Sequence, residues 1–143
     1  MSLKIEGLDE LNATLAKLPM EFEHEAAKLV NSTANGIRNN AVRMIQRPSA
    51  SGVTYEKYSP KRTHTASAAG EPPNTDTGRL IGSIRVQQAG RATAEVIAGV
   101  DYARHLEFGT RHMAARPFMT PAVEQERSKF ERGLRELTRR AIK

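Results

Sequence analysis

The strongest constraint on the fold is a pair of alternating runs between Ile84 and Val100. In the first run Ile84 and Val86 alternate with Arg85 and Gln87, and in the second every other residue from position 94 to position 100 is apolar, namely Ala94, Val96, Ala98 and Val100. A short segment that contains Gly90 separates the runs. This pattern predicts an antiparallel hairpin with one apolar face. Such a face must be covered, so we expect helices to pack on it.

Helical periodicity is found on both sides of this hairpin. Leucines at positions 8, 11, 15 and 18 predict a short helix, and a longer stretch from about Met20 to Gln46 carries a second apolar stripe. Polar residues from Asn31 to Gly36 interrupt that stripe, which predicts a kink or a loosened turn near Gly36. A last helix is expected from about Pro121 to Ala141, with Thr120 as its N-cap.

Residues 47–77 differ from the rest of the chain. This stretch is rich in Pro, Ser, Gly, Thr and Ala and shows no sustained periodicity. Loops of this length are uncommon inside compact domains and are usually functional or disordered. Because it carries Tyr55 and Tyr58 among basic residues, we interpret it as an arm that meets a partner; the alternative is a mobile loop without a role. The sequence thus predicts one α+β domain over residues 1–143, in which a long N-terminal helix and a C-terminal helix pack on a small antiparallel sheet.

The composition narrows the classes of function. The chain has no cysteine, so disulfides, thiolate nucleophiles and cysteine-ligated zinc are excluded. It has no apolar stretch near 18 residues, and we expect no contact with a membrane. The formal net charge of +6 favours DNA, RNA or acidic protein surfaces as partners, or serves solubility alone.

Residues suited to catalysis are scarce. His105 and His112 flank Glu107, which raises the idea of a metal site or a general base, but their spacing across Gly109 gives it little geometric support. No phosphate-binding loop, nucleophile elbow or dinucleotide motif is present. We therefore expect no enzymatic activity, no cofactor and no metal.

The segment from Tyr102 to Ala122 has a distinctive composition. It places Tyr102, Phe108 and Phe118 among arginines and methionines, the enrichment that is typical of protein interfaces. The alternative is a turn that anchors the core before the last helix. Both roles can hold at once, and we expect both.

The run YARHLEFGTRHMAARPFMTPA resembles a motif of the tail-completion proteins of tailed bacteriophages, which are also known as head–tail joining or minor tail proteins. The opening KIEGLDEL and the segment TGRLIGSIRV fit the same family. The resemblance covers nearly the whole chain, with the arm similar only in its length. The positions that match the motif are Tyr102, Glu107, Phe108, Gly109, Thr110, Arg116, Pro117 and Phe118.

This resemblance implies a structural virion protein at the phage neck. Copies of the chain would form a ring, commonly a hexamer, between the head-completion or connector proteins and the tail terminator or tail tube protein. Genomic DNA would pass through the lumen without sequence specificity, and assembly would take place in the cytoplasm of the bacterial host. Gly109 would adopt a positive φ, Phe108 and Phe118 would be buried, and Arg116 would bond carbonyls or a neighbour's carboxylate.

Three other interpretations remain open at this point. The charge and the basic last helix are compatible with a DNA- or RNA-binding module, although acidic residues are interleaved with the basic ones and no helix-turn-helix is evident. A second ring protein of phages, the tail terminator, has a similar size and architecture. A hydrolase or nuclease would need His105, Glu107 or His112 in a metal-dependent reaction.

Overall fold

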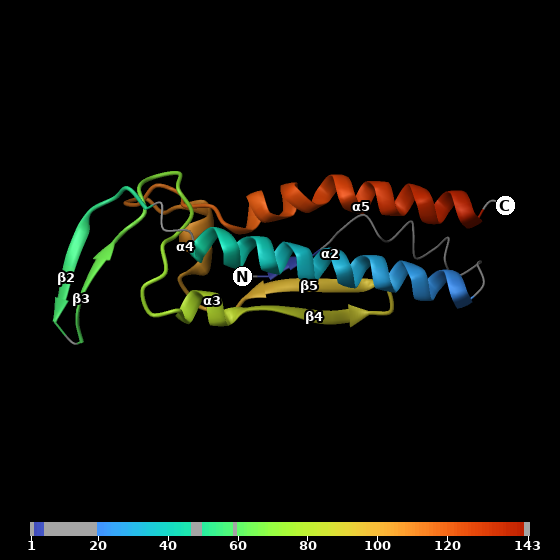
Figure 1. Ribbon diagram of the computed structural model, residues 1–143, viewed down its shortest axis with the longest axis horizontal. Helices are drawn as coiled ribbons and strands as arrows, with labels where there is room; N and C mark the ends of the chain where they lie inside the picture. Colours follow the sequence, from blue (N-terminus) through green and yellow to red (C-terminus); the bar gives the residue numbers. More distant parts are fainter. Residues whose placement is uncertain (1, 5–19, 47–49, 59, 142–143) are drawn as a thin grey trace.

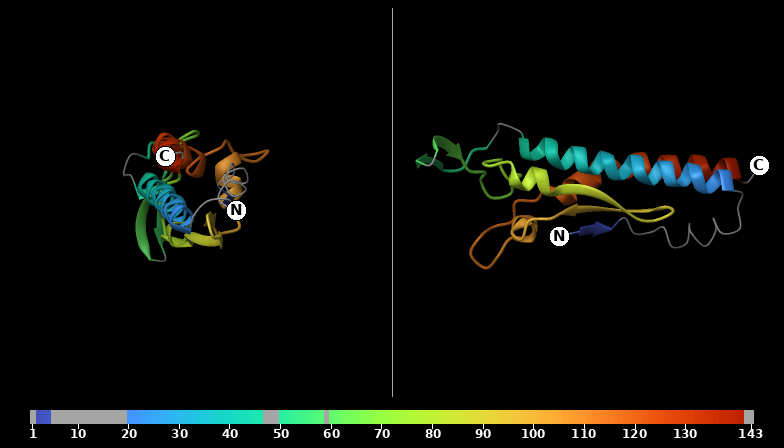
Figure 2. Two further views of the ribbon diagram at one scale, coloured as in Figure 1. Left: turned by 90° about the vertical axis from the view of Figure 1, so that its right-hand side faces the viewer. Right: turned by 90° about the horizontal axis from the view of Figure 1, so that it is seen from below.

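The computed structural model describes residues 2–4, 20–46, 50–58 and 60–141. The helix expected over residues 8–18 lies outside the described residues. Two long helices dominate the fold, α2 (Met20–Gln46) and α5 (Met119–Ala141), and they run antiparallel, side by side (Figures 1 and 2). Two short helices, α3 (Arg79–Ser83) and α4 (Ala103–Phe108), lie at the end of the molecule where α2 finishes and α5 begins (Figure 1).

The predicted hairpin is confirmed. Strand β4 (Ile84–Gly90) pairs antiparallel with β5 (Thr93–Ala98), and Val86 lies opposite Val96. A third strand, β1 (Ser2–Lys4), pairs antiparallel with β5 from the other side, which gives the strand order β1-β5-β4. We call these three strands the core sheet. The N-terminal strand was not predicted, because three residues are too few to show an alternating pattern.

The core lies between α2 and the core sheet. The alternate residues of β5, Ala94, Val96 and Ala98, are each fully buried, and α2 covers this face with Val30 and Ile37 among other side chains. Helix α5 packs alongside α2 and contributes Phe118, Met119 and Ala122 to the same core cluster. The α+β class, with an N-terminal and a C-terminal helix and small antiparallel sheets, is therefore confirmed.

Helix α2 is continuous through the segment where a kink was expected. Two of the polar side chains there bond back to their own helix, Thr33 to the carbonyl of Leu29 at 2.8 Å and Asn35 to the carbonyl of Asn31 at 2.9 Å. These bonds satisfy the side chains without an interruption of the backbone ladder. Gly36 instead allows the two long helices to approach closely, because a Cβ at this position would lie 2.6 Å from Oε2 of Glu126 on α5.

The arm is not a loop throughout. It contains a second, two-stranded antiparallel sheet, β2 (Thr54–Tyr58) and β3 (Lys61–Thr65), which we call the arm hairpin. Figure 1 shows it projecting from the end of the molecule, away from both long helices. The expectation of an irregular arm was wrong here because, among the described residues, neither strand of the arm hairpin contributes to a core cluster. Its strands therefore lack the apolar alternation by which strands are recognised.

Candidate assembly surfaces

The Glu107 carboxylate joins the two halves of the motif in the segment 102–122. It accepts the backbone N–H of Phe118 at 2.8 Å, of Met119 at 2.9 Å and of Thr120 at 2.8 Å. The Thr120 hydroxyl donates to the same carboxylate at 2.5 Å. Although it is a charged residue, Glu107 is 4% exposed. The end of α4 is thereby fixed to the start of α5.

This contact caps the N-terminus of α5. The first N–H groups of a helix have no partner within it, and a negative charge is favoured there by the helix dipole. Thr120 was expected to serve as N-cap, and that prediction was wrong: α5 begins at Met119, so Thr120 is already helical. The cap is a carboxylate from another helix, and the Thr120 side chain donates to it.

The loop between α4 and α5 closes on itself. Gly109 has a φ of 74°, so its predicted positive φ is confirmed, and a Cβ here would lie 2.8 Å from the backbone of Met113 and Ala115. The Thr110 N–H donates to the carbonyl of Met113 at 2.8 Å, and the Arg116 N–H donates to the carbonyl of Leu106 at 2.6 Å. Only glycine fits this turn without strain.

The two phenylalanines of the motif have opposite environments. Phe118 is fully buried, as predicted, but Phe108 is 66% exposed, and the expectation that it is buried was wrong. The reason is the helical spacing in α4: Ala103 and Glu107, four residues apart, both face inward, and Phe108 follows on the outer side. Tyr102, at the start of α4, is 39% exposed.

The other motif residues contribute less. Thr110 is exposed, Pro117 is half-buried, and Arg116 is half-buried with its Nε atom enclosed and without a hydrogen-bond partner. Among the residues that the structure describes, the Nε atom of Arg116 therefore does not make the expected bond to a carbonyl or a carboxylate.

The arm hairpin has two different faces. Lys57, Arg62 and His64 lie on one face and surround the carboxylate of Asp76, in the linker that follows the hairpin. The Lys57 ammonium donates to Asp76, and an Arg62 terminal nitrogen lies 2.9 Å from it. The hydrogen bond from Lys57 is the main cause that lowers the pKa of Asp76 below its usual value, and the charge of Arg62 acts in the same direction.

Tyr55 and Tyr58 are 51% and 74% exposed. They stand at an odd spacing on β2, so they point to opposite faces of the arm hairpin. The Asp76 anchor was not predicted from the sequence. Its partners are 12 to 19 positions away, and only the hairpin register brings them together.

The three residues considered for a metal site are not brought together. Glu107 is buried and bonded to the start of α5, whereas His105 and His112 are exposed. Over residues 2–4, 20–46, 50–58 and 60–141, no cluster of three or more His, Asp or Glu side chains suits a metal ion.

In the same ranges, no helix combines the length and the apolar character needed to cross a bilayer.

A known protein family matches most of the chain. Residues 9–109, more than half of the chain, match the model of the HK97-gp10-like family, whose description is "Bacteriophage HK97-gp10, putative tail-component". The matched range includes the arm, the β4–β5 hairpin and α4 up to Gly109. No curated protein sequence and no solved structure matches the chain significantly. Because this family model matches more than half of the chain, the chain belongs to the HK97-gp10-like family of bacteriophage tail components.

Proposed function

We propose that this chain is a structural subunit that assembles with copies of itself into a ring, commonly of six, which joins the phage tail to the DNA-filled head. In this proposal it has no catalytic role. Its partners are the head-completion or connector proteins on one side and the tail terminator or tail tube protein on the other. Genomic DNA passes through the lumen without sequence-specific contacts, and the subunits assemble in the host cytoplasm.

The observation that carries the proposal is the arm hairpin. It projects from the end of the molecule (Figure 1), and neither α2 nor α5 packs closely on it. It also bears Tyr58, which is 74% exposed. Both of its strands are edge strands among the described residues, and such edges pair readily with other chains. A monomer gains little stability from a projection of this kind. An assembling subunit gains a surface that reaches its neighbour.

A second exposed aromatic residue supports the proposal. Phe108 is 66% exposed and directly follows Glu107, whose four hydrogen bonds fix the local backbone. An aromatic ring held on a rigid turn loses little conformational entropy when a partner covers it, and such residues dominate interface energies.

The charge pattern of α5 argues against sequence-independent DNA binding as the main function. Its basic side chains are largely neutralised by acidic neighbours on the same helix, as in the pairs Glu124–Arg127 at 2.9 Å and Glu136–Arg140 at 3.4 Å. A surface that binds DNA phosphates is expected to leave such cations free. A tail terminator of related architecture remains the nearest alternative.

Complementation of a phage that lacks this gene tests the proposal. The test variant replaces residues 54–65 by an Asn-Gly turn, which keeps the Ser51–Glu71 contacts at the hairpin base. We expect wild-type protein to restore virions, and the variant to yield filled heads and separate tails in electron micrographs. Lys28→Ala, at an exposed ion pair on α2, is the matched control and should complement fully. Normal virions from the hairpin variant would overturn the proposal.

A further inference from the structure

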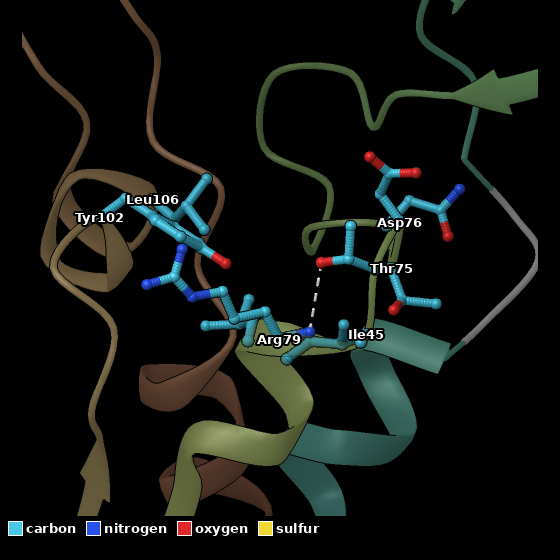
Figure 3. Close-up of a pocket in the computed structure, with 10 residues that line it drawn as sticks. Ile45, Thr75, Asp76, Arg79, Tyr102 and Leu106 are labelled. Carbon is cyan, nitrogen blue, oxygen red and sulfur yellow. Dashed lines mark hydrogen bonds between the residues drawn. The ribbon is translucent and has the colours of Figure 1, made fainter. Parts of the chain in front are cut away.

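A pocket of about 240 Å³ opens between the end of α2, the linker around Asp76, and helices α3 and α4. One part of its wall is apolar, with Ile45 fully buried and Leu80 8% exposed, and the linker residues 74–77 form a polar side. Tyr102, which directly precedes α4, and the exposed Arg79 also line it, and Figure 3 shows Tyr102 and Leu106 on one side with Thr75 and Asp76 on the other. Apolar side chains with an aromatic ring and a guanidinium beside them are typical of pockets that receive an anchor side chain.

The arm hairpin carries a side chain suited to such a pocket. Tyr58 is 74% exposed at the end of β2, and its hydroxyl donates to Glu56 at 2.8 Å. Tyr58 and Glu56 are two residues apart in the strand and therefore share one face, opposite the face that Asp76 holds. The free face thus presents an aromatic ring beside a carboxylate, with the exposed Lys61 opposite Tyr58 on β3.

We propose that this face docks into the pocket of a second copy, with the Tyr58 ring between Leu80 and Tyr102 and the Glu56 carboxylate on Arg79. Glu56 and Arg79 are complementary in charge. Arg79 has no ion-pair partner among the described residues, and Glu56 likewise forms no ion pair there. Each copy would supply one arm and one pocket, which is the head-to-tail arrangement that closes a ring. This inference rests on the assembly proposed above.

The position of the pocket fits this exchange. Asp76 lines the pocket and bonds to Lys57 and Arg62 near the turn of the arm hairpin, so the pocket and the arm lie at the same end of the molecule. The strands of the arm are five residues long, which corresponds to a reach of about 17 Å. The arm projects away from the body (Figure 1), and in the proposed ring its tip would reach the pocket of the neighbouring copy.

Disulfide cross-linking tests the contact, and the absence of native cysteine makes the experiment clean. Thr63→Cys protein, which keeps Tyr58 and Glu56, is mixed with Thr77→Cys protein. Thr63 is exposed opposite Glu56 on the docking face, and Thr77 is exposed and lines the pocket. Docking raises the effective concentration of the two thiols, so we expect the mixed dimer to form roughly tenfold faster or more than with Tyr55→Cys. Tyr55 is the matched control because it lies on the arm hairpin but on the other face. Equal rates for both variants would overturn the proposal.

Charge reversal is the second test. Glu56→Arg and Arg79→Glu should each weaken self-association, measured by sedimentation, by roughly tenfold. The double variant should restore it, because the pair is then reformed with opposite sign. A double variant no better than either single one would refute the docking. If the double variant is not restored but wild-type protein self-associates and complements the phage, only this contact is wrong. If wild-type protein neither self-associates nor complements the phage, the proposed function is wrong as well.

Discussion

The Glu107 carboxylate accepts the backbone N–H of Phe118 at 2.8 Å, and this bond joins the two parts of the sequence motif that resembles tail-completion proteins. Glu107 lies in the last turn of helix α4, and Phe118 directly precedes α5. One buried side chain therefore fixes the orientation of α5 relative to α4. The motif is therefore a structural joint, and the glutamate that suggested a general base serves as a helix cap.

Replacement of this carboxylate should destabilise the fold. For Glu107→Ala we expect the free energy of unfolding to fall by about 3 kcal/mol, because bonds to a charged acceptor contribute roughly 1.5–3 kcal/mol and orphaned buried donors cost roughly 1–3 kcal/mol each. Urea denaturation measures this value. Glu124→Ala, in an exposed pair on α5, should change it by less than about 0.5 kcal/mol. Equal losses for the two variants would contradict the capping role.

The two phenylalanines of the motif should separate stability from assembly. Phe118→Ala removes a fully buried ring and should cost about 3–5 kcal/mol. Phe108→Ala removes a ring that is 66% exposed, so the stability of the monomer should change by less than about 0.5 kcal/mol while incorporation into virions is lost. Thermal unfolding measures the effect of each variant on stability, and complementation measures its effect on assembly. A strongly destabilised Phe108→Ala protein would show that this ring belongs to the core.

Gly36 and Glu126 should be coupled across the two long helices. In the wild-type background, Gly36→Ala places a Cβ 2.6 Å from the Glu126 carboxylate and disturbs its 2.9 Å bond from Asn40, which should cost about 1–2 kcal/mol. In a Glu126→Ala background the same change should stabilise by up to about 1 kcal/mol, the difference in helix propensity. A double-mutant cycle measures the coupling. The same sign in both backgrounds would exclude close approach of the helices at this point.

The Asp76 anchor should depend on pH. Because the pKa of Asp76 is lowered in the folded protein from its usual 3.8, its contribution is complete above that value and is lost as the pH falls through the lowered pKa. Amide exchange in β2 and β3, corrected for the intrinsic rate, should therefore quicken in acid. Asp76→Asn should show faster exchange at neutral pH already. Protection of these strands that is identical in wild-type and Asp76→Asn protein would refute the anchor.

The sequence predicted those elements whose pattern is imposed by a core. Alternation in β5 and the stripe on α2 are visible because Val96 and Ile37 must both reach the same apolar interior. The arm hairpin lacks such a pattern because it packs on no core, and its strands are held by charges and backbone bonds instead. The positive φ of Gly109 was predictable from residue type alone.

The candidate sites depended on tertiary contacts that residue types do not specify. Glu107 could be a base, a ligand or a cap from its sequence context, and only the position of α5 decides between these. The burial of Phe118 and the exposure of Phe108 follow from the direction of α4, which the sequence leaves open. Arg79 and Tyr102 share one pocket although 23 positions separate them, so no local motif could indicate it.

The mass of the purified protein across a concentration series, measured by sedimentation velocity, tests the central claim of self-assembly most directly. We predict a transition from the 15.8 kDa chain to one closed species of defined copy number, without larger polymers. The variant without residues 54–65 should remain at the mass of one chain. Wild-type protein that stays monomeric at every concentration would contradict the account.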